Sequence, residues 1–358
     1  MSRVYLDWNA TAPLRPEARD AMIAAMDVVG NPSSVHGEGR KAKALIEKAR
    51  EQVADLVGIE RNEVVFTSGA TESAALATQG RKLACADVEH DCVYAHQFSS
   101  VPTDRSGEVN FDTFEGDLLA VQASNSETGV LQNNIHWAQK AWKQDAMVLV
   151  DAVQSAGKFG TNLNNLGADF LMLSAHKLGG PKGVGALCLK LGVEVKPTIT
   201  GGGQEEGRRS GTENIIGIAG FGAAALAAEQ DRKAGKWDAL FELRNALEAR
   251  IAENAPNAIF IGQDAPRLAN TSCFAVPGWK GETQVMQMDL AGFAISAGSA
   301  CSSGKVKASR VLKAMGYDDI TASSAVRVSI GPTTTKQEVM NFADAWIKAY
   351  HKFAAKAA

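Results

Sequence analysis

The stretch Ser174-Ala175-His176-Lys177-Leu178-Gly179-Gly180-Pro181-Lys182-Gly183 directs the interpretation of the whole chain. It follows the apolar run 168–173, which predicts a short buried strand, so Lys177 is expected where a strand meets its loop. Ligands of open α/β sheets bind at the carboxyl ends of strands, and a lysine among small residues there suits a Schiff base with a cofactor aldehyde. A solvated loop lysine is the alternative, and this stretch alone favours it, since most lysines are exposed.

Length and composition indicate an ordinary globular enzyme. The chain has 358 residues and a net charge of -3, with acidic and basic residues interspersed, so we expect two domains and neither a nucleic-acid nor a membrane partner. The weakly polar run 215–228 is too short to cross a bilayer and predicts a buried helix. Residues 1–7 lack the apolar core of a signal peptide, which predicts a cytoplasmic protein.

The cysteines give no sign of a disulfide framework or a metal site. Their number is odd, no two form a CxxC pair, and they are Cys85, Cys92, Cys188, Cys273 and Cys301. The first four have apolar neighbours and are expected to be small core side chains. Cys301 differs because its neighbours are small and polar, which is typical of a loop, and because nearby lysines and Arg310 would favour the thiolate.

Segments of strand type alternate with helical and loop segments. Strands are predicted at 63–66, 83–88, 117–123, 146–150 and 169–173, and helices at about 16–27, from a capping turn at 31–34 to near 58, and at about 236–254. The alternation predicts an α/β fold with a largely parallel sheet covered by helices. A boundary near the last helix gives a large domain, 15–236, and a smaller α/β domain made of 1–14 and 237–358.

Polar residues follow four consecutive predicted strands. His90, Asn125, Asp151 and Lys177 each come where a strand ends, and Gln154 follows closely. Any one of them could be a satisfied loop residue, but four together predict a site at one edge of the sheet. The turn 67–72 between a strand and a helix would present backbone N–H groups to an anion such as phosphate, although an ordinary capped helix explains it equally well.

Four motifs, taken together, resemble a known family. They are 67–73 (TSGATES), 174–177 (SAHK), 209–212 (RSGT) and 296–301 (SAGSAC), in the family's order and at similar intervals. The chain resembles the cysteine desulfurases of the nitrogen-fixation and iron–sulfur-assembly type, within the class V aminotransferase superfamily, from Tyr5 to about Gly331. The resemblance implies the pyridoxal-phosphate-dependent transferase fold of the aspartate aminotransferase type.

The resemblance also implies how the cofactor, pyridoxal 5'-phosphate, is held. Lys177 would carry it as a Schiff base, and Asp151 would keep its ring nitrogen protonated, because an adjacent carboxylate favours the charged ring. His90 would stack on the ring and move protons. The remaining matches are Ala70, Thr71, Ser174 and His176 for the phosphate, Gln154 for the ring hydroxyl oxygen, Ser126 where the family usually has asparagine, and Thr212 for the phosphate of a partner subunit in a homodimer.

The implied substrate is L-cysteine, with Asn9, Asn125 and Arg327 in substrate-binding positions. A planar guanidinium suits bidentate capture of the substrate carboxylate, while an exposed strand arginine is the ordinary alternative for Arg327. Cys301 would attack the substrate sulfur, keep it as a persulfide and release alanine. The persulfide would then pass to an acceptor protein, whether an iron–sulfur scaffold or a sulfur carrier.

Three other functions remain compatible with the sequence. A selenocysteine lyase or an ordinary aminotransferase of the same superfamily would share the cofactor residues, but an aminotransferase has no use for a reactive Cys301. An inactive relative that serves as a scaffold belongs to a different class. Intact Lys177, Asp151, His90 and Cys301 argue against it.

Overall fold

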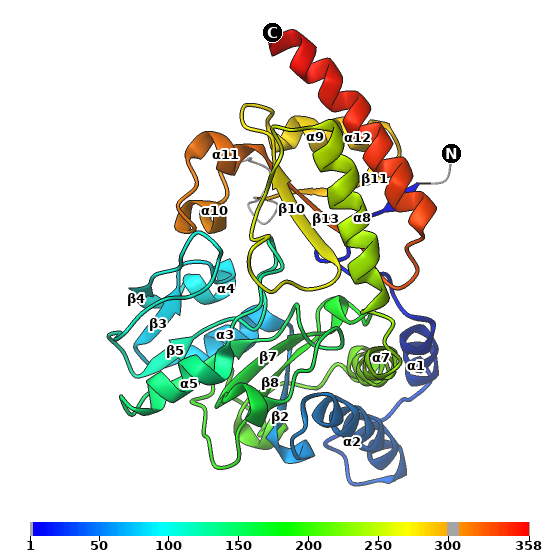
Figure 1. Ribbon diagram of the computed structural model, residues 1–358. Helices are drawn as coiled ribbons and strands as arrows, with labels where there is room; N and C mark the ends of the chain where they lie inside the picture. Colours follow the sequence, from blue (N-terminus) through cyan, green and yellow to red (C-terminus); the bar gives the residue numbers. More distant parts are fainter. Residues whose placement is uncertain (1–2, 299–307, 358) are drawn as a thin grey trace.

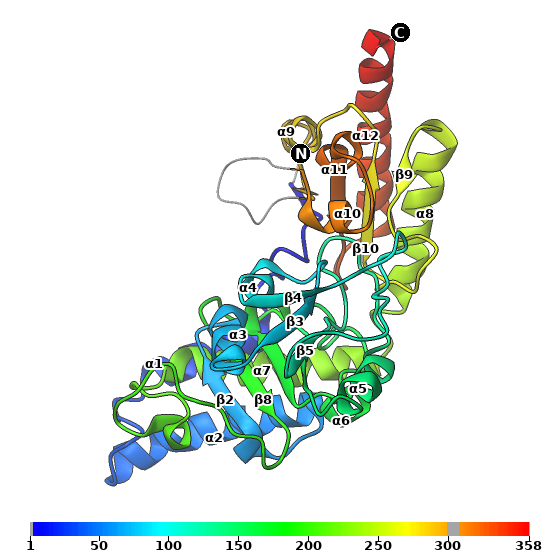
Figure 2. The ribbon, with the colours of Figure 1, turned by 90° about the vertical axis from the view of Figure 1, so that its left-hand side faces the viewer.

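The computed structural model describes residues 3–298 and 308–357. Cys301 lies outside the described residues. Figure 1 shows a lower part built on a large sheet and an upper part that contains the carboxyl-terminal helix, and Figure 2 shows the same two parts from the side. No helix within the described ranges is long and apolar enough to span a membrane.

A seven-stranded sheet forms the centre of the lower part. Its strand order is β2-β8-β7-β6-β5-β3-β4, and every neighbouring pair is parallel except those made by β8. The strands are β2 (Val64–Thr67), β3 (Leu83–Ala86), β4 (Gln97–Val101), β5 (Leu118–Ala120), β6 (Met147–Asp151), β7 (Phe170–Ser174) and β8 (Gly185–Leu189). The predicted α/β fold with a largely parallel sheet is therefore confirmed, although the strands predicted at 83–88 and 117–123 end earlier.

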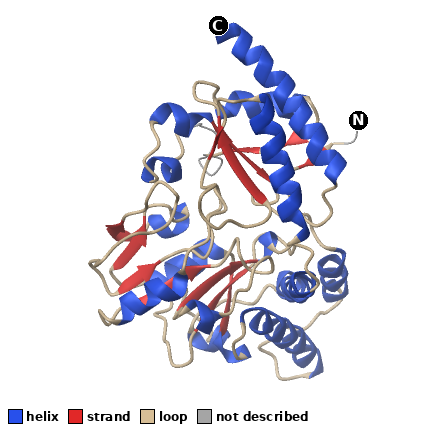
Figure 3. Ribbon diagram, viewed as in Figure 1, coloured by secondary structure: helices blue, strands red, loops and turns tan. Residues whose placement is uncertain are grey.

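Both faces of this sheet are buried, which explains why its strands are apolar throughout rather than alternating. In β7, Leu171 and Leu173 face one core cluster and Phe170 and Met172 face another. The first face is covered by α1 (Pro16–Met26), α2 (Gly37–Val57), α5 (Asn134–Trp142), α6 (Leu163–Leu166) and α7 (Ile215–Lys233). The second is covered by α3 (Ala70–Thr78) and α4 (Asp91–Tyr94). Figure 3 shows the helices on both faces.

Helix α7 confirms the buried helix predicted from the weakly polar run. Its glycines permit close packing, because a Cβ on Gly222 would lie 2.5 Å from the Cα of Ala49 in α2, and one on Gly220 would lie 2.6 Å from the Met22 side chain in α1. Alanine and glycine in this run therefore reflect helix packing. The prediction that the turn 31–34 caps α2 is wrong: His36 is the capping residue and accepts from the Gly39 N–H.

The upper part is built on a smaller sheet of order β12-β13-β10-β9 and on the pair β1-β11. The strands are β1 (Val4–Tyr5), β9 (Ile259–Phe260), β10 (Thr271–Ala275), β11 (Phe293–Ala294), β12 (Ser296–Ala297) and β13 (Ala325–Ser329). The helices are α8 (Ala239–Asn254), α9 (Gly281–Leu290), α10 (Arg310–Ala314), α11 (Asp319–Ser324) and α12 (Lys336–Ala357). Because β1 pairs with β11, the amino-terminal strand is joined to this part. The domain boundaries expected from the sequence stay a prediction.

Candidate active site

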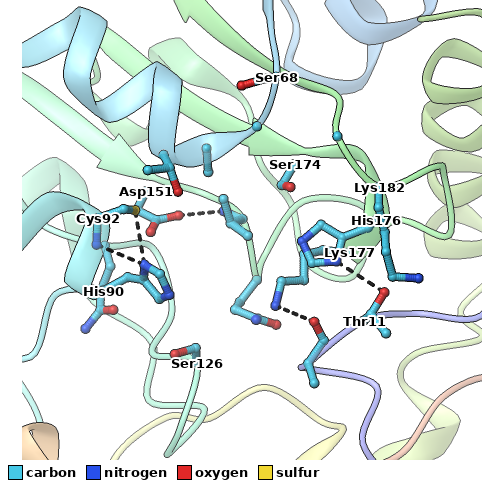
Figure 4. A pocket seen from close by; sticks show the side chains of 18 residues that line it. Thr11, Ser68, His90, Cys92, Ser126, Asp151, Ser174, His176, Lys177 and Lys182 are labelled. Carbon is cyan, nitrogen blue, oxygen red and sulfur yellow. Dashed lines mark hydrogen bonds between the residues drawn. The ribbon is translucent and has the colours of Figure 1, made fainter. Parts of the chain in front are cut away.

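A cavity of about 530 Å³ lies where the parallel strands of the large sheet end. Its lining includes nine of the residues expected to hold a cofactor or act on it, namely Ala70, Thr71, His90, Ser126, Asp151, Gln154, Ser174, His176 and Lys177. Figure 4 labels six of them around a common space: His90, Ser126, Asp151, Ser174, His176 and Lys177. The fold thus brings the ends of four strands and the start of helix α3 to one place, as open α/β sheets do.

Lys177 lies in the short 3-10 turn Ala175–Lys177 that follows β7. Its Nζ donates to the backbone oxygens of Asn9 and Ala10, the latter at 2.9 Å. These oxygens belong to the segment that links β1 to α1, so the lysine joins the two parts of the molecule. The alternative of a solvated loop lysine is therefore excluded, and the amine is placed within the cavity.

One end of the cavity suits an anion. Helix α3 begins at Ala70 and has no side-chain cap at Gly69, so the N–H groups of its first turn remain directed at the cavity. Lys182 also lines the cavity, next to His176. Burial, followed by the charges of Lys177 and Lys182, lowers the pKa of His176 to about 4, so this imidazole is neutral near pH 7.

The turn before α3 is held from outside the cavity. Glu72 accepts from the Ser68 N–H at 2.7 Å and from Arg209 Nε at 2.8 Å. The guanidinium and the Ser68 donor lower the pKa of this carboxyl group despite its burial, which keeps it ionised. The RSGT motif therefore contributes to the site by fixing the anion-binding turn.

Asp151 is the last residue of strand β6, and its side chain lines the cavity. Its Oδ1 accepts from the Val153 N–H at 2.9 Å. Burial raises the pKa of Asp151, while the nearby His90 and Lys177 oppose that rise. A buried carboxylate of this kind is stabilised by a neighbouring cation, and a protonated pyridine nitrogen is such a group.

His90 caps helix α4, and its ring forms a pair with Cys92. The Nδ1 atom of His90 lies 3.2 Å from the Cys92 N–H and 3.0 Å from the Cys92 Sγ, as the dashed lines in Figure 4 mark. An N–H only donates, so Nδ1 is an acceptor and the thiol is its second donor. The expectation that Cys92 is a core side chain is wrong: Cys92 is partly exposed and lines the cavity. Cys85, Cys188 and Cys273 are buried, as expected.

Gln154 and Asn9 form a polar network beside Lys177. The Gln154 Nε2 donates to the Asn9 backbone oxygen at 2.9 Å, and the Asn9 side chain donates to Ser126 O and Thr271 Oγ1. Asn9 does not line the cavity, but its backbone oxygen also accepts from Lys177. The substrate contact expected for Asn9 stays a prediction.

Arg327 and Asn125 lie behind the cavity wall. Arg327 is 5% exposed, so the surface alternative for it is wrong; it donates to Ser126 O at 2.9 Å and to Asp7 at 2.7 Å. Its Nε has no hydrogen-bond partner among the described residues. Asn125 Oδ1 accepts from the N–H groups of Glu127 and Thr128, so this amide shapes the turn. Their expected contacts with substrate stay predictions.

Thr212 lies away from the cavity of its own chain. It is exposed, in the loop before α7, and lines a different pocket of about 120 Å³ with Arg209 and Glu213. This position is compatible with a contact to a second subunit, which stays a prediction. The described residues contain no group of three or more His, Cys, Asp or Glu side chains that could hold a metal ion.

Sequence reasoning missed several residues of the cavity. They are Ala10, Thr11, Ser68, Cys92, Gln122, Val153 and Lys182. Lys182 lies within the stretch SAHKLGGPKG. A second lysine, five residues after Lys177 and close to the expected phosphate-binding residues Ser174 and His176, could have been predicted to lie in the site. Thr11 was not recognisable, because only the fold brings its hydroxyl to 3.2 Å from the His176 Nδ1.

The sequence and the structure of this chain are similar to those of known proteins over nearly their whole length. The model of the aminotransferase class-V family matches residues 4–342. The chain is 39% identical to a cysteine desulfurase of Cereibacter sphaeroides over 95% of this chain and 93% of that protein. The structure of a NifS-like protein from Rickettsia africae superposes with a TM-score of 0.90 at 30% identity, covering 98% of this chain and 99% of the other.

A further solved structure, SspA in complex with cysteine, is 27% identical, with a TM-score of 0.75, and covers 93% of this chain and all of the other. The family model and the relatives extend over nearly the whole chain, across both sheets and every element that lines the cavity. The chain belongs to the aminotransferase class-V family.

Proposed function

We propose that this protein is a cysteine desulfurase that binds pyridoxal 5'-phosphate and transfers the sulfur of L-cysteine to Cys301. The observation that carries the proposal is the single cavity that joins Lys177, the buried Asp151 and the uncapped start of α3. An amine, an acid and an anion site that line one cavity suit the aldehyde, ring nitrogen and phosphate of that cofactor. Relatives named cysteine desulfurase and a neighbour in complex with cysteine support the choice of substrate.

The residues of the cavity fit the cofactor as a set. The phosphate would lie against the N–H groups of Ala70 and Thr71 and beside Ser174 and His176. Asp151 would face the ring nitrogen, because a buried carboxylate with a raised pKa gains from a cation at that point. The bound cofactor supplies an aldehyde for amines and a ring that withdraws electrons from the substrate.

The chain's own groups then move protons and hold the substrate. Lys177 Nζ takes the α-proton of cysteine and later returns a proton to the product, since its amine lies in the cavity, next to the backbone oxygens of Asn9 and Ala10. Arg327 binds the substrate carboxylate; its buried Nε, without a described partner, is a donor that such an oxygen would satisfy. His90 presents its Nε2 side to the ligands, because Nδ1 is engaged by Cys92.

The sulfur step involves Cys301. Its thiolate attacks the sulfur of the bound cysteine, so that an S–S bond forms while the C–S bond of the substrate breaks. The carbon takes up a proton and leaves as alanine, and the sulfur stays on Cys301 as a persulfide. An acceptor protein would receive it, and Thr212 would complete the phosphate site of a partner subunit in a homodimer.

The test is the release of alanine and sulfide from L-cysteine in the presence of dithiothreitol. The purified chain with pyridoxal 5'-phosphate is expected to be yellow and to produce both products in equal amounts. Lys177→Ala should lose the absorbance of the lysine-bound cofactor, while Cys301→Ala should keep it and lose sulfide release. Alanine that forms only when pyruvate is added would indicate transamination, and a chain that cannot bind the cofactor would indicate a scaffold.

A further inference from the structure

Asp7 is a carboxylate in contact with Arg327 that the mechanism above does not use. It lies in the segment that follows β1. Its Oδ1 accepts from Arg327 Nη2 at 2.7 Å, and its Oδ2 accepts from Ser296 Oγ at 2.8 Å. Arg327 belongs to β13 and Ser296 to β12, and the two residues are partners in the register of these strands. Asp7 therefore connects the amino-terminal segment with two strands of the smaller sheet.

The backbone at Asp7 is held as well as its side chain. Asp7 forms a bridge with Ser329 of β13, and the next residue, Trp8, donates its N–H to the Ser329 backbone oxygen at 3.1 Å. The Asp7 backbone oxygen accepts from the Ala10 N–H at 3.0 Å. A carboxylate on a backbone that is already ordered loses little further freedom when it pairs with a cation. Asp7 is thus able to hold a guanidinium in a fixed direction.

The contact with Asp7 leaves part of the Arg327 guanidinium open. The Asp7 oxygen that accepts from Arg327 is Oδ1, while Oδ2 accepts from Ser296, so the contact is not the bidentate one that a carboxylate can form with two guanidinium nitrogens. Arg327 Nη1 donates to the backbone oxygen of Ser126, a residue that lines the cavity, and Nε has no partner among the described residues. Both terminal nitrogens are therefore held, and the edge that includes Nε is left for another acceptor.

The charge of Asp7 has two opposite effects. A buried guanidinium without a counter-charge is costly, and Asp7 forms an ion pair with Arg327, so the cation can be in place before a ligand arrives. A second carboxylate on the same guanidinium would, however, be repelled by Asp7. The benefit of Asp7 to a carboxylate ligand must therefore come from the orientation of Arg327. Removal of Asp7 weakens binding if orientation dominates and strengthens it if repulsion dominates.

We propose that Asp7 is a positioning residue that selects substrates with a carboxylate: it holds the Arg327 guanidinium in one orientation, so that the edge with Nε donates to the carboxylate of the amino acid. The inference rests on the proposed function for the identity of that ligand. The orientation of Arg327 is a property of the chain alone, and it is measurable without the cofactor.

The first experiment measures this orientation in the full chain without added cofactor. Rotation about the Cζ–Nε bond exchanges the two terminal nitrogens, so NMR of protein labelled at the arginine nitrogens gives separate Nη1 and Nη2 signals from a held guanidinium and an averaged signal from a rotating one. Loss of the signals in Arg327→Lys assigns them. We expect separate signals in the wild type and an averaged signal in Asp7→Ala. Separate signals in Asp7→Ala would overturn the proposal.

Asp7→Asn distinguishes orientation from charge. The amide oxygen of asparagine can still accept from Arg327, and its NH2 group can donate to Ser296 Oγ, although the negative charge is gone. We expect this variant to keep the separate Arg327 signals and most of the affinity for a carboxylate ligand. Loss of both would show that the charge of Asp7 matters and that its hydrogen bonds do not, which contradicts the positioning role.

The second experiment titrates the absorbance of bound pyridoxal 5'-phosphate with L-alanine and with ethylamine, which is the same amine without the carboxylate. Asp7→Ala should weaken the binding of L-alanine about tenfold and leave that of ethylamine unchanged. Equal losses for both ligands would show a general effect on the cavity, and tighter binding of L-alanine would show that repulsion dominates. Either result would overturn the proposal.

Glu248 provides a matched control. It forms an ion pair with Arg267, and their side chains are 14% and 6% exposed, against 17% and 7% for Asp7 and Arg327. Neither Glu248 nor Arg267 lines the cavity. Glu248→Ala should therefore lower the Tm as Asp7→Ala does, but it should leave the ratio of the two ligand affinities at the wild-type value.

Ser296→Ala serves if Asp7→Ala does not fold. It removes the second contact of Asp7 and keeps the ion pair, so we expect L-alanine binding to weaken about threefold with no change for ethylamine. A wild-type ratio of the two affinities in this variant would count against the proposal. A wild-type chain that binds no pyridoxal 5'-phosphate would refute the proposed function, while the NMR signals would still decide whether Asp7 holds Arg327.

Discussion

At the scale of single residues, the thiol of Cys92 fixes the position of the proton on the His90 imidazole. Burial raises the pKa of the Cys92 thiol, so it stays protonated near pH 7 and donates to the imidazole. A thiol that donates to Nδ1 leaves the proton of the neutral ring on Nε2. The cavity thus contains Cys92, a cysteine distinct from the nucleophile proposed at Cys301.

Removal of this donor predicts a partial loss of activity. In Cys92→Ala the imidazole loses one hydrogen bond of about 1 kcal/mol, which corresponds to an approximately fivefold lower kcat for alanine formation. Cys92→Ser restores a donor of similar size and should recover much of the loss. Equal rates for the alanine and serine variants, in protein with wild-type Tm, would show that the hydrogen bond does not matter.

At the scale of elements, the site depends on how closely three strand ends approach one another. Gly185, the first residue of β8, pairs with Thr67 of β2 and Ser174 of β7. A Cβ at this position would lie 2.7 Å from the Gly69 Cα and from the Leu173 backbone oxygen. The turn before α3 can therefore reach the loop that carries Lys177 only because residue 185 has no side chain.

Gly185→Ala is expected to separate these strand ends. Backbone atoms cannot move aside as a flexible side chain can, so we expect a loss of about 1–3 kcal/mol in the free energy of unfolding and weaker binding of pyridoxal 5'-phosphate. Urea unfolding and cofactor titration measure the two effects. Gly160→Ala is the control, because a Cβ there meets nothing within 4 Å and should change neither quantity. Wild-type affinity in Gly185→Ala would contradict the argument.

At the scale of the whole molecule, buried acids near the site link stability to pH. Glu89 is fully buried, and its Oε1 accepts from the Gln122 N–H while Oε2 has no partner among the described residues. Burial, followed by the charge of Asp151, raises the pKa of Glu89 from 4.5 to about 8. Glu89 is thus protonated in the folded chain near pH 7 but ionised in the unfolded chain.

The sign of the resulting pH dependence follows from linkage. A raised folded-state pKa contributes stability that is fully present below about pH 4.5 and is lost as the pH rises through about 8. We expect Glu89→Gln to become more stable relative to the wild type as pH rises through this window, with a slope of at most about 1.4 kcal/mol per pH unit. Urea unfolding at a series of pH values measures it, and Glu253→Gln, an exposed change on α8, should show no such trend. If the free energies of unfolding of Glu89→Gln and the wild type change with pH in parallel, Glu89 is not the group responsible for the pH dependence.

Much of this arrangement was recognisable from local pattern. Apolar runs followed by polar residues predicted the parallel sheet and placed His90, Asp151 and Lys177 at one edge, because the carboxyl ends of parallel strands meet. The exact strand ends were less predictable, since hydrophobic runs continue into buried loops such as the one after Ala120. The helix cap at His36 was missed because the turn 31–34 carries stronger capping residues.

The sequence by itself determined the chemistry of the protein: which residue types follow each strand, and therefore that an amine, an acid and an anion site occur at one sheet edge. Only the tertiary structure decided which of these residues meet. Asn125 follows β5 and Asp151 ends β6, yet the amide of Asn125 holds backbone N–H groups while Asp151 reaches the cavity. Gln154 meets the Asn9 backbone oxygen through the docking of residues 7–12. Sequence spacing does not encode such contacts, because they depend on how separate elements pack.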